Sequence, residues 1–366
     1  MKMNRSSVVL EYQLVSNFNE VRKRLLSPEF ADRLDKPLAY WALPSDRSSP
    51  IALMGRTLRE LLNEPFEELI GTPGIGQKKI KCLIDLLNRA ARPQPPGAIE
   101  TPPSAADNSL AAEGGPVDTS LVSEALWVQW QQTVRDHGLG SEALGRYAPS
   151  LERLPRVIWN TPLDAYTELT LAQIRALKTH GEKRVRAVLE VFGSLHAMLA
   201  GVSKQSHLTM RILPSFVGHL EDWTTNVLHR TVAANAATIR QSFVDPLMAQ
   251  VQIDAGDQIV ELVESRLRLD GTGATVRQVA RRMGLTRARV YQLLADVAAV
   301  MSVRWPEGVV TVHNLRDFLR NEINDAKQLE LFDGVVELFF PDKRQEGGFT
   351  AGGALVPKLT AQSHAG

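Results

Sequence analysis

Arginine is concentrated in one short part of the chain, residues 275–304. The basic residues there are Arg277, Arg281, Arg282, Arg287, Arg289 and Arg304, against Asp296 alone, a local balance of 6 − 1 = +5. Every one of these cations is arginine, whose planar guanidinium donates paired hydrogen bonds to phosphate or to the O6 and N7 atoms of guanine. The segment therefore indicates contact with a nucleic acid.

The same segment has the residue order of two helices joined by a tight turn. Thr275 is a good N-cap for a short helix over 276–283, and Gly284 interrupts that helix. Thr286 then caps a second helix, which begins at Arg287. This order predicts a helix-turn-helix, in which the second helix enters the major groove of DNA and its first residues meet base edges.

The residues predicted to touch DNA lie at the start of the second helix and on the first helix. Gln292 could pair with adenine, and Tyr291 could reach a phosphate or a thymine methyl group. The full set is Thr286, Arg287, Ala288, Arg289, Tyr291 and Gln292 on the second helix, with Arg277 and Arg281 on the first. The alternative is a helical bundle with an accidental glycine turn and a solvated basic face.

A glycine-rich turn far upstream is a second candidate for phosphate contact. One helix is expected to end near Ile70, and another to begin at Gly76 and run through Leu87. The new helix opens with free N–H groups and the positive end of its dipole, where a phosphate oxygen can sit. This is the helix-hairpin-helix arrangement, and the residues predicted to hold phosphate are Gly74, Gly76, Lys78 and Lys79.

An internal repeat relates this hairpin to a second one, at an offset of 163 − 58 = 105 residues. Leu58, Leu61, Phe66, Leu69, Gly76, Ile80, Leu83 and Leu87 fall opposite Leu163, Tyr166, Leu171, Ile174, Gly181, Val185, Val188 and Phe192. A basic pair follows each glycine, so Gly181, Lys183 and Arg184 are predicted to hold phosphate in the second copy. The alternative is that both hairpins only pack, or that they dock proteins.

The first hairpin resembles a known family. Its segments TLRELL (57–62) and LIGTPGIGQKKI (69–80) are similar to the C-terminal domain of the bacterial RNA polymerase α subunit. The resemblance covers residues 56–87 and implies that Gly76, Lys78 and Lys79 face DNA phosphates along a minor groove. Residues 162–192 are a weaker match to the same family.

The arginine segment resembles another family. TVRQVARRMGLTRARVYQ (275–292), preceded by LDG (269–271), is similar to region 4 of bacterial σ factors. The resemblance implies binding of a promoter element and contact with RNA polymerase. Ala288 stands where that family has an acidic base reader and Tyr291 where it has an arginine, so a different DNA sequence is expected to be recognised.

The chain as a whole is expected to be mainly α-helical. Trp127, Trp130 and Val134 follow a helical spacing, whereas 309–312 and 335–340 are short strand candidates. The predicted parts are a first helix-hairpin-helix module (1–92), a Pro/Gly-rich disordered linker (93–120), a second such module (121–201), a helical domain with the helix-turn-helix (202–341) and a disordered tail (342–366).

Composition excludes several classes of protein. The 366 residues include 42 Lys+Arg against 41 Asp+Glu, and one cysteine, Cys82, so neither a disulfide within the chain nor a multi-cysteine metal site can form. No apolar run approaches the ~18 residues of a membrane-spanning helix. Asp254, Asp257, Glu261 and Glu264 are expected on a solvated face. We expect no enzyme, no cofactor and no metal, and a cytoplasmic, nucleoid-associated protein.

These patterns predict a protein that binds double-stranded DNA, with RNA polymerase or another protein complex as a further partner and no membrane partner. A transcription regulator or polymerase-associated factor fits the two resemblances best. The alternative is a DNA-tethered adaptor in a replication, repair, mobile-element or phage-defence complex, or an accessory to a nuclease or helicase on another chain.

Overall fold

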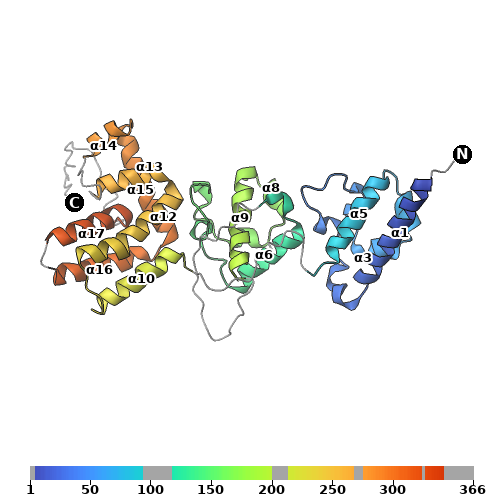
Figure 1. The fold of residues 1–366 in the computed structure, drawn as a ribbon, viewed down its shortest axis with the longest axis horizontal. Helices are drawn as coiled ribbons and strands as arrows, with labels where there is room; N and C mark the ends of the chain where they lie inside the picture. The colour runs from blue at the N-terminus through green and yellow to red at the C-terminus, as the bar shows by residue number, and fades with distance from the viewer. Residues whose placement is uncertain (1–4, 94–117, 200–212, 268–274, 324–325, 342–366) are drawn as a thin grey trace, which may run out of the picture. The chain divides into compact units, whose positions relative to one another are not determined.

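The structure is a computed structural model, and it describes residues 5–93, 118–199, 213–267, 275–323 and 326–341 (Figure 1). These residues divide into two compact units, Met1–Ser215 and Phe216–Gly366. The predicted linker at 93–120 lies outside the described residues except at its two ends. The predicted tail at 342–366 and residues 269–271 lie wholly outside them.

The described residues are mainly helical, which confirms the predicted fold class at this level. Their only extended pairings are two isolated bridges, Pro37 with Thr57 and Ala143 with Pro162. Both strand predictions are wrong, because residues 309–312 lie in a helix and 335–340 lie in or directly after another. In both places the buried residues recur every three or four positions, as a helix requires, and a short run of valines does not reveal that period.

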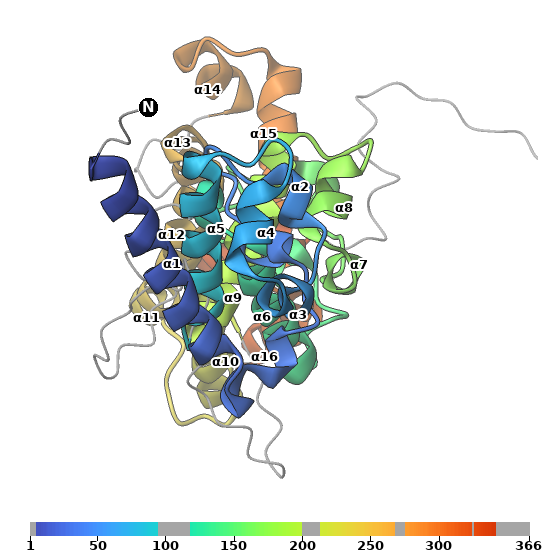
Figure 2. The same cartoon turned by 90° about the vertical axis from the view of Figure 1, so that its right-hand side faces the viewer.

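The first part of unit 1 is a small helical module built around α1 and α5, which lie alongside each other (Figures 1 and 2). Its elements are α1 (Arg5–Leu25), η1 (Pro28–Arg33), η2 (Leu38–Trp41), α2 (Ile51–Met54), α3 (Leu58–Asn63), α4 (Phe66–Gly71) and α5 (Gln77–Ala90). Phe18 and Leu25 of α1 meet Leu83 and Leu87 of α5 in one fully buried core cluster. This core holds the short helices that lead into the first glycine turn.

The second part of unit 1 is built in the same way around α6 and α9, which pack against each other. Its elements are η3 (Thr119–Leu121), α6 (Glu124–Asp136), η4 (Leu144–Arg146), η5 (Arg156–Ile158), α7 (Asp164–Thr167), α8 (Leu171–Ala176) and α9 (Glu182–Leu199). Trp127, Trp130 and Val134 are all buried, as their spacing predicted. The ring centroids of Trp127 and Phe192 lie 4.7 Å apart at the centre of this core.

The repeat found in the sequence is also a repeat of backbone structure. Helices α4 and α8 both have six residues and begin 171 − 66 = 105 residues apart, and α5 and α9 begin 182 − 77 = 105 residues apart. All the apolar residues paired by the repeat are buried. Two backbone hydrogen bonds also recur: Leu58 N–H to Lys36 O and Leu163 N–H to Glu142 O, both 3.0 Å, and Leu38 N–H to Arg56 O and Leu144 N–H to Thr161 O, both 2.8 Å.

Unit 2 is a helical bundle in which α15 contacts α12, α13, α14, α16 and α17. Its elements are α10 (Ser215–Leu228), α11 (Ala236–Ile239), η6 (Arg240–Val244), α12 (Asp245–Ala255), α13 (Asp257–Arg266), α14 (Val276–Arg282), α15 (Arg287–Arg304), α16 (Gly308–Glu322) and α17 (Ala326–Phe339). The η6 segment is one π-helical turn just before Pro246, which has no N–H to continue the regular ladder. Trp223 and Trp305 are buried in this bundle.

Candidate nucleic-acid interface

Helix α14 and the turn after it have the local structure that the sequence predicted. Thr275 Oγ1 accepts from the Gln278 N–H (3.3 Å) and Gln278 Oε1 accepts from the Thr275 N–H (2.8 Å), which forms a capping box. Gly284 ends the helix at φ +65°, and the Leu285 N–H donates to Ala280 O at 2.8 Å. A residue with a Cβ is strained at this φ, so glycine makes the turn possible.

Helix α15 presents its first residues to solvent. Thr286 Oγ1 accepts from the Arg289 N–H at 3.2 Å and so caps the helix. Val290, Leu293 and Leu294 are buried against the bundle. The predicted base-contacting residues are exposed, with Tyr291 at 49%, and they are Arg287, Ala288, Tyr291 and Gln292. One solvent-facing side of α15 therefore carries all four.

Arg304 does not belong to this surface, which corrects the local charge sum. Its side chain is buried, its Nε donates to Asp254 Oδ2 at 2.9 Å, and its Nη2 lies 2.5 Å from Asp254 Oδ1. Gln250 Nε2 donates to the same carboxylate at 2.7 Å. Asp254 is thus buried and paired, not on the solvated face predicted for it. Sequence spacing missed the pair because its partners lie 50 residues apart on α12 and α15.

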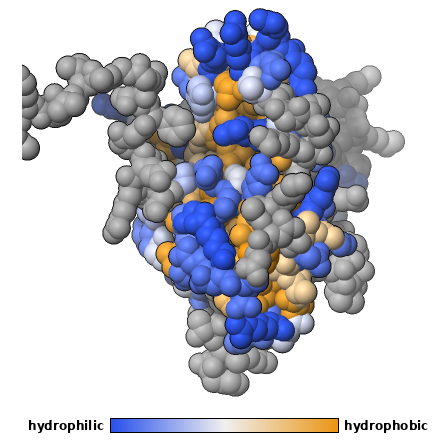
Figure 3. All heavy atoms as spheres, turned by 90° about the vertical axis from the view of Figure 1, so that its left-hand side faces the viewer, coloured by the Kyte–Doolittle hydropathy of each residue, from blue (hydrophilic) through white to orange (hydrophobic). Residues whose placement is uncertain are grey.

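Four arginines remain for an external partner. Arg282 lies 3.4 Å from Glu261 of α13 in a surface ion pair. The others, Arg277, Arg281, Arg287 and Arg289, are exposed, and none has an ion-pair partner within the part of the chain that the structure describes. Figure 3 shows hydrophilic side chains gathered at the end of unit 2 that α14 and the start of α15 form. This end of the unit carries unneutralised positive charge.

The first hairpin joins α4 to α5 through a four-residue turn. The Ile75 N–H donates to Thr72 O at 3.0 Å, with Pro73 and Gly74 between them. Gly74 has φ +82°, as the third position of a type II turn requires. Ile75 is buried beneath the turn, and Gly76 is the N-cap of α5 in extended conformation, with φ −104°.

The second hairpin closes with the same hydrogen bond but a different turn. The His180 N–H donates to Leu177 O at 2.8 Å, and Thr179, which replaces Gly74, has no positive φ. His180 takes the place of Ile75, and its Nε2 lies 2.9 Å from Tyr166 Oη. Desolvation, and then the charge of Arg184, hold the pKa of His180 below its ordinary value of 6.5. His180 is therefore neutral at pH 7.

The two members of each basic pair differ in what they contact. Lys79 Nζ donates to Gly74 O at 2.7 Å, and Arg184 Nη1 donates to Thr179 O, so the second basic residue ties the helix to its own turn in both copies. Lys78 and Lys183, the first members, are exposed. In each pair, therefore, one basic residue stabilises the turn and the other is exposed to solvent.

Gly76 and Gly181 are not required by the packing of the chain. A Cβ placed on either would meet nothing within 4 Å. Neither has the positive φ that favours glycine, in contrast to Gly74. Serine or asparagine would cap the following helix at least as well. The first N–H groups of α5 and α9 are thus open to close approach from outside, in both copies.

The described residues bear on three other kinds of site. They include no group of three or more His, Cys, Asp or Glu side chains that could hold a metal ion. None of their helices is long and apolar enough to cross a bilayer. Cys82 is half-buried, and desolvation raises the pKa of its thiol, which makes it a poor nucleophile at neutral pH.

Comparison of the chain with protein-family models, with curated proteins and with solved structures found no match.

Proposed function

We propose that this chain binds double-stranded DNA, with α14 and α15 acting as a helix-turn-helix. The observation that carries the proposal is the set of four exposed arginines without ion-pair partners around a capped, glycine-dependent turn. Arg277 and Arg281 hold phosphates, while Arg287, Tyr291 and Gln292 meet base edges. The buried Asp254–Arg304 pair supports this role, because it anchors the far end of α15 to α12.

The two hairpins bind the phosphate backbone as helix-hairpin-helix motifs. The support is that Gly76 and Gly181 leave the starts of α5 and α9 uncovered without any internal need for glycine. Lys78 and Lys183 supply the charge beside these N–H groups, while Lys79 and Arg184 stiffen the turns. If six to ten phosphates are held in total, the affinity falls by about 10³–10⁵ between 50 and 200 mM salt.

In the cell, this chain is a transcription regulator or polymerase-associated factor. The support is that its hairpins resemble an RNA polymerase α-subunit domain and its helix-turn-helix resembles a σ-factor region. The adaptor role in replication, repair, mobile-element or phage-defence work is the second candidate, and the exposed hairpin surfaces would then dock protein. Affinity purification decides between them: RNA polymerase is recovered with a regulator, and a different complex with an adaptor.

Fluorescence anisotropy with a random-sequence duplex pool tests DNA binding. Changing Arg287 and Arg289 to Ala together lowers the affinity at least about tenfold, because each loses charge-assisted hydrogen bonds. Arg240→Ala is the matched control, since Arg240 is an exposed arginine of the same unit on η6. A flat salt response, or equal affinities for the double variant and the control, would contradict the proposal.

A further inference from the structure

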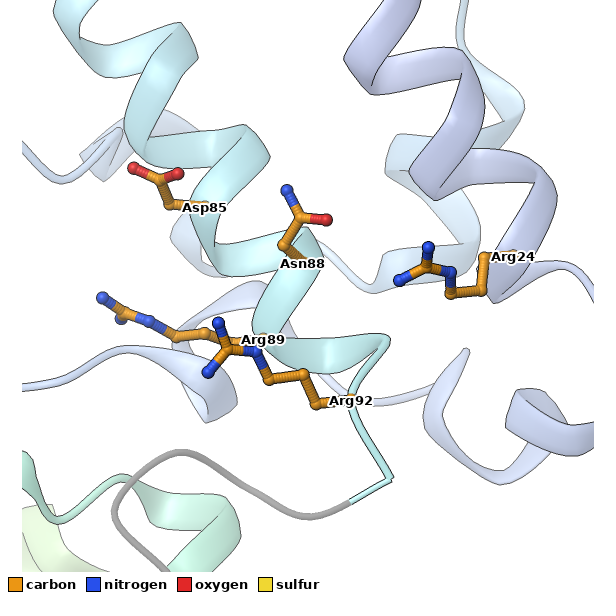
Figure 4. Close-up of a pocket in the computed structure, with 5 residues that line it drawn as sticks. All are labelled: Arg24, Asp85, Asn88, Arg89 and Arg92. Atoms are coloured by element: carbon orange, nitrogen blue, oxygen red, sulfur yellow. The ribbon is translucent and has the colours of Figure 1, made fainter.

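A polar pocket of 430 Å³ lies in the first module, between the last turn of α1 and the C-terminal half of α5. Five residues line it: Arg24 from α1, and Asp85, Asn88, Arg89 and Arg92 from α5 and the turn after it (Figure 4). The sequence did not single out any of them, because α1 and α5 are far apart in the chain. The pocket is also at the opposite end of α5 from the glycine turn.

Arg89 forms a fixed part of the pocket wall. Its Nη1 and Nη2 donate to Asp46 Oδ2 and Oδ1 at 2.5 and 2.7 Å. Desolvation raises the pKa of Asp46, but the hydrogen bonds from Arg89 and from the Leu43 N–H outweigh it, and the pKa lies below its ordinary value. Asp46 therefore stays charged at neutral pH and holds the Arg89 guanidinium in one place.

Arg24 and Arg92 supply the positive charge that Asp46 does not offset. Arg24 points from α1 toward α5 in Figure 4, and its only ion pair within the described residues is a loose one to Glu20 at 3.6 Å. Arg92 is exposed and has no ion-pair partner in that part of the chain. Asp85 is the single carboxylate on the lining. Asn88 adds an amide that can donate or accept.

The second copy does not keep three of the five side chains that line this pocket. The position equivalent to Asn88 is Gly193, since 88 + 105 = 193, and a Cβ there would lie 3.1 Å from the Trp130 ring. In the second copy the Trp130 indole therefore packs directly against this position. Ser194 and Ala197 replace Arg89 and Arg92. Arginines in a last helical turn complement the helix dipole, but that does not explain why they line an open pocket.

We infer that this pocket binds a phosphoryl group. Arg24 lines it from α1 and Arg92 from the turn after α5. Guanidinium forks match the oxygens of a phosphate monoester or diester. The Asn88 amide donates to a further oxygen, and Asp85 favours a ligand with few charges or with a hydroxyl that can donate to it. The group comes either from a nucleic-acid backbone or from free phosphate, and the inference does not depend on DNA contact by α14 and α15.

Nuclear magnetic resonance of arginine Nε–H groups in the full chain tests this site. Inorganic phosphate is expected to shift the Arg24 and Arg92 signals saturably, at constant ionic strength. Arg24→Ala and Arg92→Ala each weaken this binding about tenfold, the loss expected for one charge-assisted contact. Lys23→Ala is the control, because Lys23 is an exposed cation in the same turn of α1 that does not line the pocket.

A second titration, with duplex DNA, identifies the source of the phosphoryl group. Shifts with duplex that are lost in Arg92→Ala indicate backbone phosphate, whereas shifts with inorganic phosphate alone indicate a free ligand. The inference is overturned if neither probe shifts these signals saturably, or if Arg24→Ala, Arg92→Ala and Lys23→Ala bind alike. DNA binding by Arg287 and Arg289 can persist in that case, so the two proposals fail separately.

Discussion

The two copies in unit 1 share a backbone but differ at their surfaces. Helices α4 and α8 begin and end at matching positions, α5 and α9 begin at matching positions, and the apolar residues paired by the repeat are buried in both copies. The turns differ, with Gly74 at positive φ in one and Thr179 without it in the other. The pocket beside Asn88 is also open in the first copy, while Trp130 covers the matching position in the second.

This comparison separates what the fold needs from what a partner would need. Gly74 allows a type II turn that the second copy does not have, so only the first copy requires a glycine at this position. Gly76 and Gly181 recur although no contact or torsion within the chain requires them. A glycine that is present in both copies, although nothing within the chain requires it, indicates contact with a partner. Substitutions at four pairs of matching positions test that division, and the largest effect on stability is expected in the core.

Gly193→Asn places the first copy's residue in the second copy and is expected to destabilise it by about 3 kcal/mol. The new Cβ would lie 3.1 Å from Trp130 in a buried place, and the amide would have to be desolvated. The reciprocal change, Asn88→Gly, costs about 0.3 kcal/mol through helix propensity alone. Native-state hydrogen exchange reports on α9 and α5 separately. Equal small effects would mean that the second copy also has room here.

Gly74→Ala is expected to destabilise the first copy by about 1–2 kcal/mol, because a Cβ is strained at φ +82°. Thr179→Ala, at the matching position, loses one exposed hydrogen bond, from Thr179 Oγ1 to His180 Nδ1 at 3.0 Å, and is expected to cost about 0.5 kcal/mol. The same exchange measurement compares them. A second copy that responded as strongly as the first would show that its turn is also strained, contrary to its observed backbone.

The sequence predicted features that depend on near neighbours. Thr275 and Thr286 cap their helices and Gly284 ends α14, because caps and turns are set within about four residues. The repeat was visible because burial keeps apolar types at fixed spacing. The same fixed spacing of buried apolar residues leaves the interface residues of α15 exposed together. Whether they bind DNA stays a prediction.

Features that depend on distant contacts were missed. Asp254 has the spacing of a solvated carboxylate, and only its position opposite Arg304 shows that it is buried. Residues 309–312 have the β-branched character of a strand, but packing against α15 and α17 makes them helical. The pocket has Arg24 of α1 and Arg92, which follows α5, on one lining. The spacing of residues along the sequence does not indicate which distant residues lie together in the fold.

Gly76→Ser and Gly181→Ser are expected to keep or slightly raise stability while lowering DNA affinity. Serine is a better N-cap than glycine by a few tenths of a kcal/mol, and its Oγ would occupy the N–H groups offered to phosphate. Each change is expected to weaken binding about tenfold in anisotropy. Gly71→Ala is the control, since it also adds a Cβ in open space but at the end of α4.

The DNA affinities of these two serine variants show which of the two hairpins holds phosphate. A loss in both would indicate that both hairpins hold phosphate. A loss in Gly76→Ser alone would assign the second copy to another role, such as protein docking. Unchanged affinity in both variants would contradict phosphate binding by the hairpins and leave α14 and α15 as the DNA contact.

The smallest expected effect is a pH dependence confined to the second copy. Because the pKa of His180 is lowered by folding, the unfolded chain binds its proton more readily than the folded chain does. The contribution of His180 to stability is therefore complete above about pH 6.5 and is lost progressively as pH falls below that value.

His180→Ile, which installs the residue type of Ile75, is expected to remove the contribution of His180 to the slope of stability against pH. His196, whose pKa desolvation also lowers, titrates in both proteins and serves as the internal reference. If the slope of α9 protection between pH 7 and 5 were the same with isoleucine, burial of His180 and the nearby charge of Arg184 would not lower its pKa in the folded chain.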